Sequence, residues 1–410
     1  MEKELVENLD ATRVFAFDNP RRIIFGVGAT RNVGQEAGKL GRTALIVTDD
    51  SVEKAGLIGR VVEHLEKDKI SSEIFRRDAK REPSFESMNE AAEFIRQHHF
   101  EMIIGVGGGS VLDTSKIMAM AATNPGQIDA YMDLQSPSEI QKDRLPLILM
   151  PTTSGTGSEA TPFAVAIDEK TALKCWAYSP KLLSNVSIID PILTLSCPPK
   201  VTANSGMDAL SQSIESVLAG GFSPLSEMIG LKAIRLISGS LSRSYHHGES
   251  LEARSDMSLG ALMGGWVLGF PWSGGGILGH GIAETVGPKL GIPHGFACAL
   301  ALPYMMEFNL PAARDKLALI ASAMGEDIRD LTRSEAATLA IQAVLELMED
   351  IDLPSSLKQV TSTIDAPALA ELVFKRRAFY ATNPRKLTQE NCLHVVEKMW
   401  EGRLSVNDHP

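Results

Sequence analysis

The sequence lacks the features that mark nucleic-acid-binding, membrane-spanning or disulfide-stabilised proteins. Its 40 Lys and Arg are outnumbered by 51 Asp and Glu, a formal net charge of −11, which argues against nucleic acid as a partner because phosphates require a basic surface. Its longest apolar stretches, such as 101–106 and 145–150, are far shorter than the ~20 residues of a membrane-spanning helix. The four cysteines show no CxxC spacing, and the N-terminus lacks the apolar core of a signal peptide. We therefore expect a cytoplasmic protein with no membrane partner.

The first half of the chain alternates short apolar runs with helical patterns. The 410 residues, 44% of them hydrophobic, are enough for two or three domains, each with its own core. We expect strands at 43–48, 71–75, 102–106 and 146–150, and helices over 51–68, over 84–98 and from residue 111 onward. This alternation predicts an α/β, Rossmann-like domain whose parallel sheet carries helices on both faces.

Beyond Pro198 and Pro199 the pattern changes to long helical periodicities separated by clusters of Pro and Gly. Helices are expected over 206–218, 225–238, 251–268, 312–324, 334–350, 366–380 and 388–400. No strand-like alternation of any length is found in this half. The sequence therefore predicts an α/β domain over residues 1–199 and an all-α helical domain over residues 200–410.

A glycine-rich turn follows the third expected strand. Gly107, Gly108, Gly109 and Ser110 separate this strand from the next helix, so the backbone can approach a pyrophosphate at the helix N-terminus. Asp113 follows on the first turns of that helix. A plain tight turn is the alternative, but the strand before and the helix after favour a dinucleotide site. The absence of GK[ST] at the required spacing excludes a Walker A motif.

Two other strand ends carry polar residues. Asp49 ends the first expected strand, where a carboxylate in a dinucleotide fold binds the adenosine ribose and disfavours the 2′-phosphate of NADP. Alternatively, Asp49 only caps the following helix. The segment PTTSGTGSE, residues 151–159, follows the fourth strand. Its hydroxyls and bare backbone suit a ribose or a nicotinamide amide, or it is a polar surface loop.

Candidate metal ligands lie in the helical half. Asp208 and Gln212 are four residues apart, which puts both on one face of a helix. His280 and His294 bracket the segment HGIAETVGPKLGIPH. Asp and His together suit a divalent metal such as Fe or Zn with an open position for a substrate oxygen. The alternative is a structural hydrogen bond between a buried Asp and a buried His.

Five motifs occur together and in order: GGGSVLDTSK, PTTSGTGSE, GMDAL, the pair of His280 and the His294 of PHG, and TNPRKLT. With them, the chain resembles the iron-containing (group III) alcohol dehydrogenases, relatives of glycerol dehydrogenase and dehydroquinate synthase. The resemblance extends from residue 17 to Trp400. It implies a dinucleotide-binding N-terminal domain, a helical C-terminal domain, an active site between the two, and a homodimer.

The resemblance also implies a role for each candidate residue. The cofactor-binding residues are Asp49, Gly107, Gly108, Gly109, Ser110, Asp113, Thr152, Thr153 and Lys174, the last three on the nicotinamide side. The metal ligands are Asp208, Gln212, His280 and His294. The catalytic residues are His280 and Glu284. The implied cofactors are NAD rather than NADP, and a divalent metal, Fe²⁺ by resemblance or else Zn²⁺.

Two positions depart from the family pattern. Gln212 stands where the family usually has His, and a neutral amide oxygen is a weaker ligand than imidazole, so iron binding should be reduced. Glu284 stands where many members have a second His near the nicotinamide; a carboxylate can replace it in proton transfer or bind a cationic group of the substrate. With GFPWSGGG (269–276) and a pocket-shaping Trp272, these changes suggest a substrate other than a simple short-chain alcohol.

The expected function is metal-assisted hydride transfer between NAD and a primary or small functionalised alcohol. Two other functions remain open from the sequence. The first is a metal-independent reductase of the same fold, in which Gln212 marks the loss of the metal site. The second is a non-enzymatic NAD-binding regulatory protein, against which Asp208, His280 and His294 argue because the other candidate ligands are intact.

Overall fold

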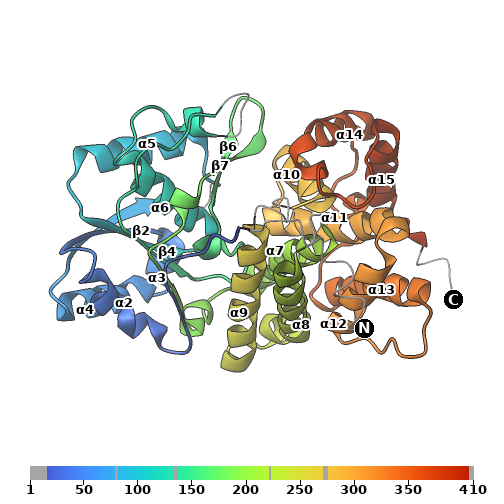
Figure 1. The fold of residues 1–410 in the computed structure, drawn as a ribbon, viewed down its shortest axis with the longest axis horizontal. Helices are drawn as coiled ribbons and strands as arrows, with labels where there is room; N and C mark the ends of the chain where they lie inside the picture. Colours follow the sequence, from blue (N-terminus) through green and yellow to red (C-terminus); the bar gives the residue numbers. More distant parts are fainter. Residues whose placement is uncertain (1–15, 79–81, 133–136, 221–222, 271–275, 406–410) are drawn as a thin grey trace.

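The computed structural model describes residues 16–78, 82–132, 137–220, 223–270 and 276–405. Figure 1 shows a half built around a β-sheet, formed by the first part of the chain, beside a half built of helices. All the strands of the described residues end by Ile189, and the long helices begin at Pro199. The predicted fold class, an α/β part followed by an all-α part, is confirmed.

Six parallel strands form the main sheet, in the order β1-β8-β5-β4-β2-β3. They are β1 (Ile23–Phe25), β2 (Thr43–Asp49), β3 (Ser71–Arg77), β4 (Met102–Gly107), β5 (Leu147–Pro151) and β8 (Val186–Ile189). One face packs on α5 (Phe85–Gln97) and α6 (Gly109–Ala121), and the other on α2 (Val33–Ala37), α3 (Asp50–Lys54) and α4 (Leu57–Lys67). The central strands are buried on both faces, as their continuous apolar sequences require.

The α/β half of the structure differs from the prediction in two respects. Strands β1 and β8 were not expected, because runs of three and four residues carry too little pattern to identify. The helix expected over 51–68 is two helices, α3 and α4, because Gly56 between them adopts a left-handed conformation with φ 74°. A left-handed residue ends one helix and lets the next begin in a new direction.

A separate antiparallel hairpin lies beside the main sheet. It joins β6 (Phe163–Asp168) to β7 (Leu173–Tyr178) and was not predicted. Along β6 the burial alternates strictly between buried and half-buried residues, the period of a strand with one covered face. The hairpin contacts α6 on one side and α10 on the other, so it lies between the two halves of the molecule (Figure 1).

The helical half forms one continuous hydrophobic core. Its helices are α7 (Pro199–Leu218), α8 (Pro224–His246), α9 (Leu251–Leu268), α10 (Leu278–Leu290), α11 (His294–Asn309), α12 (Arg314–Met324), α13 (Arg333–Asp350), α14 (Ala366–Lys375) and α15 (Gln389–Glu401). Helices α10 and α11 were not expected, because glycines, Pro288 and Pro303 interrupt their apolar periodicity. These two helices carry both of the candidate metal-binding histidines.

The predicted domain boundary after residue 199 remains a prediction, although α7 begins at that residue. Among the described residues, no helix combines the length and the apolar character needed to cross a bilayer. Trp272, which we expected to shape the substrate pocket, lies outside the described residues.

Candidate active site

A cleft separates the carboxyl ends of the central strands from the helical half. Its lining includes residues of both halves: Asp49, Gly108 and Thr152 from the ends of β2, β4 and β5, and Asp208, His280 and His294 from α7, α10 and α11. Ligands of open α/β sheets bind outside the carboxyl ends of the strands. The predicted cofactor residues and the predicted metal ligands therefore share one cavity.

The predicted phosphate-binding turn lies at the N-terminus of α6. Gly108 caps the helix with an extended backbone, and Gly109 and Ser110 begin its first turn; all three line the cleft. The free N–H groups of a first turn, together with the helix dipole, favour an anion. A Cβ on Gly109 would lie 2.6 Å from Cγ2 of Thr156, so glycine lets the 151–159 loop approach the turn. Gly107 ends β4, and a Cβ there would overlap a side chain of α6.

Asp113 fastens α6 to its neighbours. Its Oδ1 accepts a hydrogen bond from the Ser158 hydroxyl at 2.6 Å, and its Oδ2 accepts one from the Val165 N–H at 3.1 Å. The Nζ of Lys116 lies 3.8 Å from Oδ1. Because Asp113 also lines the cleft, its predicted role toward the cofactor stays open beside this structural one.

Asp49 caps a helix and also faces the cleft. Its Oδ1 accepts hydrogen bonds from the N–H groups of Ser51 and Val52 and from the Ser51 hydroxyl. Asp49 thereby fixes the start of α3, as one of the two interpretations of the sequence required. It is also part of the cleft lining. The two roles are compatible, and the ribose contact remains a prediction.

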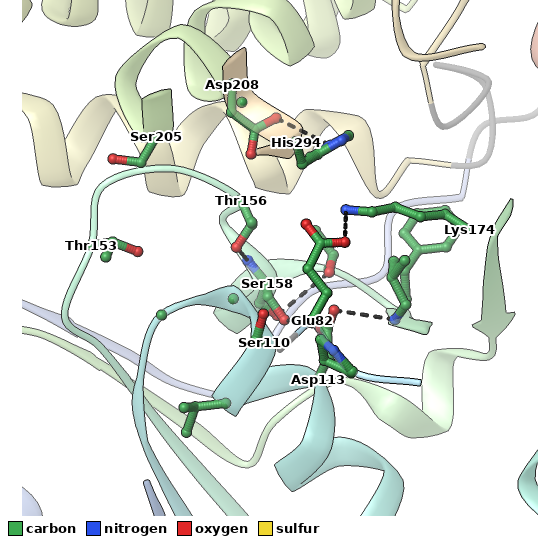
Figure 2. A pocket seen from close by; sticks show the side chains of 18 of the residues that line it. Glu82, Ser110, Asp113, Thr153, Thr156, Ser158, Lys174, Ser205, Asp208 and His294 are labelled. Atoms are coloured by element: carbon green, nitrogen blue, oxygen red, sulfur yellow. Dashed lines mark hydrogen bonds and ion pairs between the residues drawn. The ribbon is translucent and has the colours of Figure 1, made fainter. Parts of the chain in front are cut away.

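The residues predicted for the nicotinamide side lie in the same cavity. Thr152 and Thr153 line it beside the phosphate turn, and Lys174 reaches into it from β7. The Nζ of Lys174 lies 3.1 Å from a carboxylate oxygen of Glu82. Burial opposes the charged form of Lys174, but Glu82 and Glu284 outweigh it and raise the pKa. Figure 2 shows Glu82 in the middle of the cleft, between Ser110 on one side and the candidate metal ligands Asp208 and His294 on the other.

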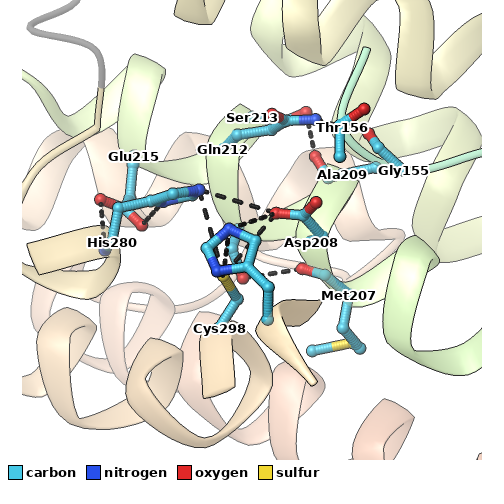
Figure 3. A network of polar contacts seen from close by, with 12 residues as sticks. Gly155, Thr156, Met207, Asp208, Ala209, Gln212, Ser213, Glu215, His280 and Cys298 are labelled. Carbon is cyan, nitrogen blue, oxygen red and sulfur yellow. Dashed lines mark hydrogen bonds and ion pairs between the residues drawn. The ribbon is translucent and has the colours of Figure 1, made fainter. Parts of the chain in front are cut away.

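Four potential metal ligands converge at the helical side of the cleft. One donor atom each from Asp208, His280, His294 and Cys298 lies within 4.8 Å of every other. Figure 3 shows Asp208, His280 and Cys298 pointing toward one another. The Asp208 Oδ1 is 3.6 Å from Nε2 of His280, 3.7 Å from Nε2 of His294 and 3.7 Å from Sγ of Cys298. Tetrahedral coordination with bonds of ~2.0–2.3 Å separates neighbouring ligand atoms by about 3.3–3.8 Å. The donor set and its spacing therefore fit a divalent transition metal.

Glu215 holds the His280 ring in place. Its Oε1 lies 2.6 Å from Nδ1 of His280, and its Oε2 accepts hydrogen bonds from the backbone N–H groups of Ile277 and His280. A carboxylate on Nδ1 fixes the tautomer that leaves Nε2 free to bind a metal. Glu215 was missed from the sequence, although it stands seven residues after Asp208 on α7, two turns along the same face.

His294 and Cys298 differ in whether they must lose a proton before they can bind a metal. Burial and the nearby Lys174 lower the pKa of His294 to about 3, so its imidazole is neutral at physiological pH. Burial raises the pKa of Cys298 to about 12, so its thiol must lose a proton to become a ligand. A bound metal supplies that driving force because it favours the thiolate. Cys298 is four residues after His294, a spacing that could have revealed it.

The amide nitrogen of Gln212 is hydrogen-bonded to the loop that follows β5. It donates a 2.7 Å hydrogen bond to the carbonyl oxygen of Gly155, in the 151–159 loop. Figure 3 shows this amide beside Gly155, while the contacts among Asp208, His280 and Cys298 form on the other side of Asp208. Gln212 lines the cleft with them. Its predicted role as a metal ligand stays a prediction.

Glu284 lines the cleft one turn after His280 and forms an ion pair with Arg376. Burial raises the pKa of Glu284, while Arg376, His280 and Lys174 act in the opposite direction. Arg376 follows α14 and was not singled out in the sequence, because nothing in its local pattern distinguishes it. The predicted catalytic pair, His280 and Glu284, is therefore brought to one wall of the cavity.

Comparison with known proteins identifies the family. The model of the iron-containing alcohol dehydrogenases matches residues 20–191, and the model of their C-terminal region matches residues 202–400. The chain belongs to the iron-containing alcohol dehydrogenase family. The choline dehydrogenase of Bacillus subtilis (strain 168) is 32% identical over 375 residues, which cover 91% of this chain and 92% of the relative. The sulfoacetaldehyde reductase of Bilophila wadsworthia (strain 3_1_6) is 31% identical over 386 residues, covering 93% and 98%.

The solved structures agree with this assignment. The alcohol dehydrogenase from Oenococcus oeni superimposes with a TM-score of 0.88 and 31% identity, covering 94% of this chain and 100% of that one. Membership confirms the predicted resemblance and the predicted enzyme class, an oxidoreductase of the alcohol dehydrogenase type. Among the relatives, a methanol dehydrogenase of Bacillus methanolicus is NAD-dependent, and the sulfoacetaldehyde reductase of Bifidobacterium kashiwanohense has been solved in complex with NAD+.

Proposed function

We propose that this protein transfers hydride between NAD and a primary or small functionalised alcohol, with a divalent metal at Asp208, His280 and His294. The observation that carries the proposal is the single cleft that joins the α6 phosphate-binding turn to the cluster of metal ligands. Cys298 is the proposed fourth protein group at this cluster, since its Sγ lies 3.6 Å from Nε2 of His294. Gln212, if its amide oxygen turns to the metal, is the alternative.

The residues of the cleft divide the chemistry between them. When bound, the metal acts as a Lewis acid on the substrate oxygen, and NAD accepts the hydride. Gly108, Gly109 and Ser110 orient the pyrophosphate, and Thr152, Thr153 and Lys174 face the nicotinamide. Glu284 accepts the hydroxyl proton when an alcohol is oxidised and returns it when an aldehyde is reduced. Glu215 keeps the His280 ring in one orientation throughout, which holds the reacting groups in a constant geometry.

Removal of the metal tests this proposal against the metal-independent reductase. Protein dialysed against a chelator should lose aldehyde reduction by NADH and regain it with Fe²⁺ or Zn²⁺. His280→Ala should abolish turnover and weaken metal binding while the affinity for NAD is nearly unchanged. His394→Ala, which changes an exposed histidine on α15, is the matched control. Full activity in metal-free protein would favour the metal-independent reductase.

Three finer properties are part of the proposal. NAD is preferred over NADP because the carboxylate of Asp49 lies in the cleft at the end of β2. A reducing compartment such as the cytoplasm suits the four free cysteines. A homodimer is supported by the edge strand β1, whose last residue, Phe25, is 39% exposed, and by Val27 just beyond it, which is 53% exposed. Light scattering of the purified protein measures the oligomeric state directly.

The names of the relatives leave the substrate open. One is a choline dehydrogenase, one a sulfoacetaldehyde reductase, and another a 1,3-propanediol dehydrogenase, that of Citrobacter freundii. Choline is a cation, sulfoacetaldehyde an anion and propanediol neutral. The charge that this chain accepts on its substrate must therefore follow from the residues of its own cleft.

A further inference from the structure

Glu284 lines the cleft beside the candidate metal ligands and forms an ion pair with Arg376. Both side chains are 10% exposed. A carboxylate at this depth is costly when unpaired, so the guanidinium compensates the charge that Glu284 would otherwise present to the substrate. Since Glu284 lies one turn after His280 on α10, this compensated charge lies next to the reacting end of any substrate held at the metal.

Arg376 is held in a fixed position by three further groups. Its Nη1 donates a 2.7 Å hydrogen bond to the backbone carbonyl of Lys174. Its guanidinium carbon lies 5.4 Å from the ring centroid of Trp176 and 5.3 Å from that of Phe379, and the two rings meet edge to face at 5.1 Å. Trp176 and Phe379 both line the cleft. The protein's own cation thus occupies the aromatic site that a cationic substrate would use.

The second basic group at this end is compensated as well. Lys174 forms its ion pair with Glu82, and the Lys174 side chain is 10% exposed. Two carboxylates, Glu82 and Glu284, therefore face two cations, Lys174 and Arg376. In the cleft, an anionic substrate meets Lys174, which is already paired with Glu82, and a cationic substrate meets Glu284, which is already paired with Arg376.

We propose that Arg376 and Glu284 together select uncharged alcohols and aldehydes and reject those with a permanent charge close to the reacting carbon. This inference rests on the proposed function. Specificity then comes from the exclusion of both cations and anions. Glu284 repels the anions that Arg376 would attract, and Arg376 repels the cations that Glu284 would attract. The apolar remainder of an uncharged substrate would lie against Trp176 and Phe379.

Three aldehydes of similar shape test the inference: 3,3-dimethylbutanal, its trimethylammonium analogue (trimethylammonioacetaldehyde), and sulfoacetaldehyde. For the wild-type protein loaded with metal, kcat/KM with NADH should be at least about tenfold higher for the neutral aldehyde than for either charged one. Binding of the three corresponding alcohols in the presence of NADH, measured as the shift in unfolding temperature, should give the same order. That second readout does not depend on turnover.

Two variants should change the preference in opposite directions. Arg376→Met leaves Glu284 without its partner, so the kcat/KM ratio of cationic to neutral aldehyde should rise by about tenfold or more. Glu284→Gln frees Arg376, so the ratio of anionic to neutral aldehyde should rise similarly, whatever the loss of kcat. The double variant should return both ratios toward those of the wild type. Arg385→Met, which removes a guanidinium 4.5 Å from the Phe308 ring, is the control and should leave both ratios unchanged.

The outcomes separate the inference from the function on which it rests. If a substitution only loosened the packing, the cationic and the anionic ratio would rise together in the same single variant, and that result would overturn the inference. The inference would also be overturned if the wild-type protein reduced a charged aldehyde as efficiently as the neutral one, or bound a charged alcohol as tightly as the neutral one. If no aldehyde is reduced, the proposed function fails, and the binding order of the alcohols still decides whether the cleft selects against charge.

Discussion

The amide nitrogen of Gln212 donates a 2.7 Å hydrogen bond to the carbonyl oxygen of Gly155, which joins α7 to the loop after β5. Gln212 stands one turn after Asp208, at the position where the family usually has a histidine ligand. The hydrogen bond fixes the amide toward the loop. This hydrogen bond is a contact between the two halves of the molecule, and the role of Gln212 as a metal ligand stays a prediction.

Restoring the imidazole at this position should change the metal preference. We expect Gln212→His to bind Fe²⁺ roughly tenfold more tightly than the wild type, because imidazole is a stronger ligand for iron than an amide oxygen. Competition with a chelator of known affinity measures the change. Gln212→Leu is the control, since it also removes the bond to Gly155 but adds no ligand; equal affinities in the two variants would contradict the prediction.

The thiol of Cys298 should matter most for a soft metal. Cys298→Ser should lower the affinity for Zn²⁺ by roughly tenfold or more and affect Fe²⁺ less, because thiolate is the softest donor of the cluster. Metal content after loading with equal amounts of both ions gives the ratio. Cys392→Ser is a matched control, since that buried thiol donates to the carbonyl of Ala370 in the helical core. An unchanged ratio in Cys298→Ser would exclude the thiol as a ligand.

Glu215 should control metal affinity without touching the metal. Glu215→Gln keeps the shape of the side chain but weakens its hold on Nδ1 of His280, and loss of such a partner typically costs about 10–100-fold in metal affinity. The affinity for NAD should stay the same. Glu307→Gln, which alters a carboxylate in the last turn of α11 that is paired with Lys398, serves as the control. A metal affinity equal to that of the wild type would show that Glu215 acts only in packing.

The two roles of Asp49 can be separated by a choice of substitutions. Asp49→Ser keeps a capping oxygen for α3 but removes the charge, so the NADP/NAD ratio of kcat/KM should rise by roughly tenfold while stability is retained. Asp49→Ala should raise the ratio similarly and also lower the free energy of unfolding by about 1 kcal/mol. Steady-state kinetics with both cofactors and denaturant unfolding supply the two numbers. If stability changes and the ratio does not, Asp49 is only a cap.

Glu159, the last residue of PTTSGTGSE, should make stability depend on pH. Burial raises the pKa of Glu159 from 4.5 to about 7. Between these values the native state holds a proton that the unfolded state has lost, so the stabilising effect of protonation is lost as the pH rises through this window. Glu159→Gln should flatten the pH dependence of the unfolding temperature within this window. Above pH 7, the unfolding temperature of the variant should be higher than that of the wild type. A slope equal to that of the wild type would contradict the shift.

The success of the sequence analysis depended on the strength of each local pattern. Strands β2 and β4 have continuous apolar runs buried on both faces, and both were predicted within one residue. The short β1 and the glycine- and proline-containing α10 and α11 gave no comparable periodicity. Glu215 and Cys298 stand at helical spacings from recognised ligands and could have been found. Arg376 could not, because its role comes entirely from contacts between distant parts of the chain.

Those contacts determine how much of the chain must be made before the cleft can be completed. Arg376 bonds to Lys174, 202 residues earlier, and to Glu284, 92 residues earlier. A nascent chain that has emerged from the ribosome as far as α13 already contains the phosphate turn, the hairpin and all four clustered donor groups. It still lacks the guanidinium that joins the hairpin to α10, so the substrate end of the cleft is completed only after α14 and Arg376 have been made.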